Sequence, residues 1–262
     1  MEERWSSAEE HGSLLRVMRW LRWTGLALIG VVGISGVARG QTPEATPSVI
    51  PDLHIAGAQV VVDEKLEQLI FQQTVAGEAG GTVPEATGEM EAATVIGYVF
   101  PTTMSPADVG FRGAEGIVAL AVTSHPDFDD TPLWDENGDG DYGNDGALYH
   151  SHWVVLGEDS RAPGGLSVVA VSGDVASALP PTSPGLPIYL DSPGFPVILR
   201  GQDVLVVVPA QRVHGQTDFR FDAVTATMRV STDPNQPTLG VTKVHSVLSG
   251  DLSLPGTPQR SE

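Results

Sequence analysis

Residues 116–158 read GIVALAVTSHPDFDDTPLWDENGDGDYGNDGALYHSHWVVLGE, and their pattern organises the rest of the chain. The run 116–124 is almost wholly apolar, which is typical of a strand buried on both faces. The run 147–156 is apolar apart from two histidines and a serine, and we expect it to be the next strand. Between the two lies a turn-rich segment crowded with aspartates. The stretch therefore predicts two strands joined by a long acidic loop.

The remaining chain continues as short apolar runs separated by turns rich in Gly, Pro and Asp. Further strands are expected over 55–62, 69–75, 93–100, 166–172, 203–209, 219–231 and 240–254. Ser105 and Pro106 can start a helix of one or two turns, and no long amphipathic helix is expected. This pattern predicts an all-β fold, either an antiparallel β-sandwich or a jelly roll, with long loops.

Residues 183–200 contain a short tandem repeat, SPGLPIYLD followed at once by SPGFPVILR. Pro187 and Pro196 open the apolar run of each copy, and proline suits the first residue of an edge strand. We interpret the prolines as protection of strand edges. The alternative is a rigid lip beside a binding site.

The N-terminal residues have the layout of a secretory signal peptide. Arginines precede an uncharged run over 23–38, and small residues, Ala38 and Gly40, stand before a cleavage point at Gln41. Either Met1 or Met18 could be the start. An uncleaved anchor is the alternative, but the run is short against the roughly 20 apolar residues that span a membrane.

The predicted domain organisation has four parts. They are a signal peptide over 1–40, a linker over 41–52, a single β-sandwich domain over 53–254 and a disordered tail over 255–262. The chain contains no cysteine, so disulfides and thiolate metal sites are excluded. Export without cysteine favours a bacterial periplasmic or extracellular protein.

The chain is strongly acidic, with 33 Asp and Glu against 14 Lys and Arg and a net charge of −19. Such a surface repels phosphate backbones, so we expect no nucleic-acid partner. We also expect no stable membrane span after cleavage of the leader. The ligand or protein partner cannot be named from the sequence.

The most acidic part of the loop, 135–141, reads DENGDGD and is followed by Asp145. Calcium takes six to eight oxygen ligands, and carboxylates two residues apart can fold around one point. Gly140 supplies a sharp turn where a side chain would clash. The sequence therefore predicts a Ca²⁺ site in this loop.

This segment resembles the first half of the calcium-binding loop of EF-hands and dockerins. The resemblance implies four ligands, three through side chains and the last through its carbonyl: Asp135, Asn137, Asp139 and Asp141. The twelfth position of the family's loop is a bidentate glutamate, but here it is Gly146. Asp145, or acids upstream in the loop, would complete the shell.

His150 and His152 are separated by one residue, so on a strand they point to the same face with Cα atoms about 7 Å apart. Their imidazoles could converge on one transition-metal ion, such as Zn, Cu, Fe or Mn. A third ligand could be His125 or Glu158. The alternative is a structural pair that hydrogen-bonds acids of the loop.

The same region resembles the first motif of the cupin family, G-(x)5-H-x-H-(x)3,4-E-(x)6-G, through His150, His152 and Glu158. Gly143 lies one residue too early for this motif and Glu158 one residue too late, and the second cupin motif is absent. The resemblance implies a jelly roll that holds Fe, Mn or Zn.

Two functions therefore remain open. The favoured one is an exported, acidic, Ca²⁺-binding β-sandwich that serves as a non-catalytic binding or cell-envelope module. The alternative is a cupin-like metalloenzyme that uses His150, His152 and a third ligand. Sequence signatures of serine hydrolases, nucleotide-binding loops and zinc proteases are absent, so no catalytic residue is assigned.

Overall fold

The computed structural model describes residues 49–85, 90–125 and 148–261. The chain divides into two compact units, 1–49 and 50–262, and the strands and helices of the described residues belong to the second. The predicted signal peptide and the acidic segment 126–147 lie outside the described residues.

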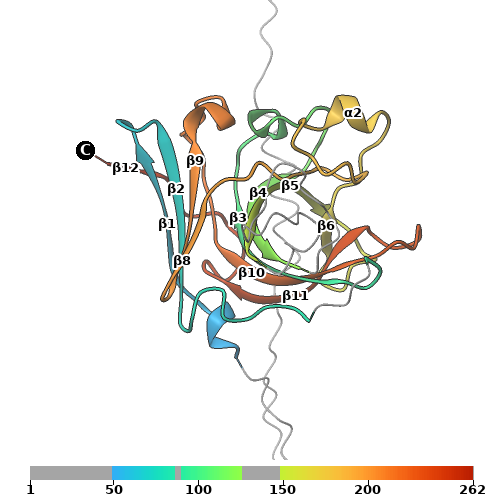
Figure 1. Ribbon diagram of the computed structural model, residues 1–262, viewed down its shortest axis with the longest axis horizontal. Coiled ribbons are helices and arrows are strands. Elements are labelled where there is room, and N and C mark those ends of the chain that lie inside the picture. The colour runs from blue at the N-terminus through green and yellow to red at the C-terminus, as the bar shows by residue number, and fades with distance from the viewer. Residues whose placement is uncertain (1–48, 86–89, 126–147, 262) are drawn as a thin grey trace, which may run out of the picture. The chain divides into compact units, whose positions relative to one another are not determined.

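The described chain is mostly strand, as Figure 1 shows. The strands are β1 (Ile55–Asp63), β2 (Gln68–Val75), β3 (Thr94–Pro101), β4 (Ile117–Ser124), β5 (His150–Glu158), β6 (Leu166–Val168), β7 (Leu190–Asp191), β8 (Val197–Arg200), β9 (Asp203–Pro209), β10 (Val224–Val230), β11 (Leu239–Val247) and β12 (Gln259–Ser261). The prediction of an all-β fold is confirmed.

The helices are short. They are η1 (Pro51–Leu53), η2 (Pro106–Val109), α2 (Val175–Ala178) and η4 (Ala210–Val213). The predicted turn of helix after Ser105 is η2, where the Ser105 side chain and the Asp108 side chain cap one another's backbone. Within the described ranges, none of the helices has the length and apolar character that crossing a bilayer requires.

The strands form two sheets. One has five strands in the order β12-β1-β2-β9-β8, and the other has seven in the order β4-β3-β10-β11-β6-β5-β7. Because β4 also pairs with β5, six strands of the larger sheet close into a small barrel. Figure 1 shows these six strands around a common centre, with β1, β2 and β9 to one side. The predicted sandwich or jelly roll is not confirmed, since the larger sheet closes on itself.

Two apolar clusters fill the fold, and β4 contributes to both. Val118, Leu120 and Val122 belong to the cluster that also contains Phe71 of the five-stranded sheet. The alternate residues of β4 belong to a second cluster, which draws on all six strands of the barrel. Since side chains alternate between the two sides of a barrel wall, the second cluster is the barrel interior. Strand β4 is therefore buried on both faces from Val118 to Ser124, as predicted for this run.

Strand β5 is also buried on both faces from His150 to Leu156. Its register with β4 runs without a bulge, and it pairs His150 with Thr123 and His152 with Ala121. Both histidines therefore share a face with Val154, which belongs to the interior cluster. The predicted same-face arrangement of His150 and His152 is confirmed.

Two segments near the sheet edges differ in detail from the prediction. Gln259–Ser261, in the segment expected to be a disordered tail, forms β12 and pairs in parallel with β1. In the tandem repeat, the second copy forms the edge strand β8 directly after Pro196, which fits the interpretation of edge protection. The first copy ends in β7, which pairs with β5 instead.

Candidate metal centre

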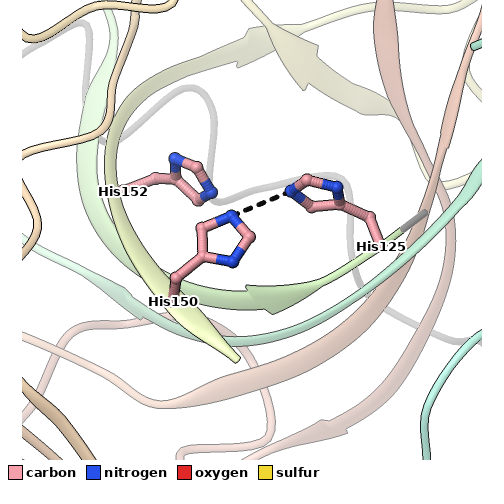
Figure 2. A group of neighbouring side chains, drawn as sticks. All are labelled: His125, His150 and His152. Atoms are coloured by element: carbon pink, nitrogen blue, oxygen red, sulfur yellow. Dashed lines mark hydrogen bonds between the residues drawn. The ribbon is translucent and has the colours of Figure 1, made fainter. Parts of the chain in front are cut away.

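Three histidines meet inside one end of the barrel: His125, His150 and His152. One ring nitrogen from each lies within 4.8 Å of the others. Figure 2 shows one nitrogen of each ring turned toward the middle of the group. This buried group could hold a metal ion.

The register of β4 and β5 explains why the three residues meet. His125 directly follows β4 and lies two residues beyond Thr123, which pairs with His150. Alternation along β5 then adds His152 on the same face. The group therefore needs only two paired strands, although 25 positions separate His125 from His150 in the sequence.

The other proposed third ligand, Glu158, does not join the group. It is the last residue of β5, six positions beyond His152, which corresponds to about 20 Å along a strand. It pairs with Leu166 and lines a groove that also contains Arg161 and Asp233. The part of the cupin resemblance that rests on Glu158 therefore has no counterpart in this arrangement.

All three imidazoles are shielded from solvent, with His125 3%, His150 8% and His152 3% exposed. The ring of His150 stands edge-on to both neighbours, with centroids 4.7 Å from His125 and 4.6 Å from His152. The group contains no carboxylate among the described residues. A polar cluster of this kind in an apolar interior needs hydrogen bonds or a metal to offset its lost hydration.

Hydrogen bonds to Nδ1 orient the rings of His150 and His152. His150 Nδ1 lies 2.9 Å from the Leu148 carbonyl oxygen, which can only accept, so Nδ1 carries the proton and Nε2 offers a lone pair. His152 Nδ1 lies 2.9 Å from Ser192 Oγ, and the ring also hydrogen-bonds to the backbone of Asp191. Metal-binding histidines use their second nitrogen in this way, which orients the ring.

The closest approach in the group is between His125 Nε2 and His150 Nε2, at 3.0 Å. Because His150 Nε2 is the acceptor, His125 Nε2 donates this hydrogen bond. Two imidazole nitrogens bound to one tetrahedral zinc ion at about 2.0–2.1 Å would lie about 3.3–3.4 Å apart. A shift of a few tenths of an ångström, with the His125 proton moved from Nε2 to Nδ1, would therefore convert the contact into two metal bonds.

The electrostatics around His152 favour its neutral form. Burial holds the pKa of His152 well below its ordinary value, and the neighbouring His150 and His125 lower it further. The hydrogen bond to the Asp191 backbone acts in the opposite direction. Neutral imidazole is the form that binds metal, so His152 is in a form that could serve as a ligand.

The depressed pKa of His152 predicts that the metal-free protein loses stability on acidification. The unfolded chain takes up this proton below about pH 6.5, whereas the folded chain does not, so stability falls as the pH drops from 7 toward 5. One such histidine contributes a slope of about 1.4 kcal/mol per pH unit in the lower part of this window. Urea unfolding at a series of pH values measures the slope.

The control is His152→Gln, which removes the titrating ring and leaves Asp191 in place. Burial raises the pKa of Asp191, so this carboxyl adds stability as the pH falls, which is opposite to the effect of His152. Both proteins contain Asp191, so the difference between their slopes measures the contribution of His152. Equal slopes in the wild type and in His152→Gln would contradict the assignment.

The structure does not describe the predicted calcium ligands. Asp135, Asn137, Asp139, Asp141 and Asp145 all lie outside the described residues. The Ca²⁺ site therefore stays a prediction from the sequence.

Several neighbours of the group were not found from the sequence. Ser192 begins the second copy of the tandem repeat, and it reaches His152 because β7 pairs with β5. Thr123 lies across from His150. The Leu148 carbonyl accepts a hydrogen bond from His150 Nδ1. The repeat boundary was visible in the sequence, but its contact with a residue 40 positions earlier depends on strand pairing.

Three neutral imidazoles on one side of an ion leave at least one coordination position for another ligand. Such a donor set suits Zn, Cu, Fe or Ni better than Ca²⁺ or Mg²⁺, which prefer oxygen. Comparisons with protein-family models, with curated proteins and with solved structures found no match for this chain, so the interpretation of the site rests on its own geometry.

Proposed function

We propose that the protein is an exported metal-binding protein that holds one divalent transition-metal ion at His125, His150 and His152. The observation that carries the proposal is the convergence of three buried ring nitrogens within 4.8 Å. Export is part of the proposal on the strength of the N-terminal sequence alone.

The arrangement of the second ring nitrogens supports a metal site over a purely structural cluster. His150 and His152 each use Nδ1 for an outer hydrogen bond, so the remaining nitrogens are available to the centre of the group. In the metal-free state, a hydrogen bond joins the inner nitrogens of His125 and His150. A bound ion would engage one nitrogen from each of the three rings at once.

The donor set also narrows the metal. Imidazole ligands suit Zn, Cu, Fe and Ni, and the affinity of divalent first-row ions rises toward Cu²⁺. The ion found in the native protein therefore depends on metal supply as well as on the site. Calcium binding by the acidic segment remains a separate prediction, and it would not use these histidines.

Metal analysis of the full chain tests the proposal. The protein is stripped with a chelator, incubated with Zn²⁺, passed through a desalting column and analysed by plasma mass spectrometry. We expect one zinc ion per chain in the wild type and almost none in His150→Ala.

His54→Ala is the matched control, because His54 is exposed and does not belong to the group. This variant should retain its zinc. Wild-type protein that keeps no Zn²⁺ and no Co²⁺ after the same treatment would overturn the proposal.

A further inference from the structure

Thr123 is a buried residue with an unused hydroxyl. It is 4% exposed, and its Oγ1 has no hydrogen-bond partner. Among the described residues, only Gln73 Oε1 and Trp153 Nε1 share this condition. Leaving a buried hydroxyl unsatisfied costs about 1–3 kcal/mol, so a group that accepts from it would be stabilising.

The position of Thr123 places it beside the histidines. It pairs directly with His150 across β4 and β5, and His125 follows two residues later. Residues that pair directly across antiparallel strands have Cβ atoms about 4.5–5.5 Å apart and point to the same face. Thr123 therefore faces the barrel interior beside His150.

The orientation of the Thr123 side chain is limited by β3. Gly97 of β3 pairs with Thr123 on the side away from β5. The Thr123 methyl carbon lies 3.3 Å from the point where a Cβ on Gly97 would stand, so the methyl occupies the space that this glycine leaves. Oγ1 and the methyl group are both bonded to Cβ of Thr123, so Oγ1 points in a different direction from the methyl group.

The charge of a bound ion supplies the reason for a fourth ligand. Three neutral imidazoles leave the double positive charge of the ion uncompensated inside an apolar barrel, and isolated buried charge is costly. An anionic ligand would reduce this charge, and a hydroxyl that donates to an anion makes a strong, charge-assisted hydrogen bond. Thr123 Oγ1 has no partner among the described residues and belongs to the residue paired with His150, so it is a donor suited to this role.

We propose that the fourth position of the ion takes a small monovalent anion, whose ligand atom accepts a hydrogen bond from Thr123 Oγ1. The proposal rests on the proposed metal-binding function. Hydroxide and small oxyanions such as formate fit this chemistry. Ala121 and Val154, which share the interior face with the histidines, fill the neighbouring space and favour an anion of few atoms.

Cobalt substitution with azide as the anion probe tests the inference. The visible absorption of bound Co²⁺ reports on its coordination, so the spectrum of Co²⁺-loaded protein is recorded during titration with sodium azide. We expect azide to change the cobalt bands of the wild type. In Thr123→Val the azide dissociation constant should rise about 10-fold or more, because the charge-assisted hydrogen bond is lost.

Two further variants make the result specific. Thr123→Ser keeps the hydroxyl and should bind azide nearly as tightly as the wild type. Thr74→Val makes the same substitution on β2, far from the histidines in the other sheet, and should leave the azide titration unchanged. Thr123→Val removes an unsatisfied polar atom at nearly constant volume, so we expect it to fold.

The outcomes separate the inference from the function on which it rests. Stoichiometric Co²⁺ binding with a spectrum that azide does not change would overturn the inference and leave the metal site intact. The same azide affinity in Thr123→Val and in the wild type would also overturn it. If no Co²⁺ binds to the wild type, the proposed metal-binding function is wrong, and the inference falls with it.

Discussion

We expect saturating Zn²⁺ to raise the melting temperature of the wild-type protein by about 8–16 °C, and His150→Ala to remove this gain. An ion that binds only the folded chain stabilises it by about 4 kcal/mol when the free ion is at 1,000 times its dissociation constant. For a domain of roughly 200 residues, each 1 kcal/mol shifts the melting temperature by about 2–4 °C. Differential scanning calorimetry of metal-free and zinc-loaded protein measures the shift.

His150 is the most informative position for this experiment because its ring lies between the other two, edge-on to both. Each variant is compared with its own metal-free form, so a change in intrinsic stability does not confuse the result. His54→Ala should show the full wild-type shift. A zinc-induced shift of the same size in His150→Ala would contradict the three-histidine site.

The same measurement with Ca²⁺ separates the predicted loop from the histidines. Any Ca²⁺-induced rise in melting temperature should survive His150→Ala, since imidazole is a poor ligand for calcium. It should disappear in Asp139→Ala, which removes a predicted loop ligand.

Trp153→Ala is expected to lower the free energy of unfolding by about 3–5 kcal/mol, as removal of a large buried aromatic side chain does. Trp153 is 1% exposed and projects from β5 on the side opposite the histidines. Its ring centroid lies 6.3 Å from that of Phe71 and 6.5 Å from that of Phe195. The indole therefore joins the outer wall of the barrel to the five-stranded sheet. Urea unfolding of metal-free protein measures the loss.

Trp153→Phe should cost much less than Trp153→Ala. The indole Nε1 is buried and has no hydrogen-bond partner, so phenylalanine removes an unsatisfied donor while it keeps most of the apolar contact. Leu66→Ala, at a residue that is 65% exposed, should change stability by less than about 0.5 kcal/mol. A loss below about 1 kcal/mol in Trp153→Ala would contradict the placement of this ring between the two sheets.

The sequence alone determined most of the local structure. The apolar runs predicted β1, β2, β3, β4 and β9 to within one or two residues at each end, because a strand buried on one or both faces leaves a clear pattern. The spacing of His150 and His152 was sufficient to put both on one face, since side chains alternate along any regular strand. His125 was identified as a possible third ligand because it ends the preceding strand.

Only the tertiary structure decided which segments meet. The closure of β4 on β5 into a barrel, the addition of β12 to the edge of β1 and the contact of Ser192 with His152 all join distant parts of the chain. Local propensity does not encode such pairings, because their register is set by the burial of whole strand faces. For the same reason, the choice of His125 over Glu158 required the register: both flank the HxH strand in sequence, but they lie at opposite ends of β5.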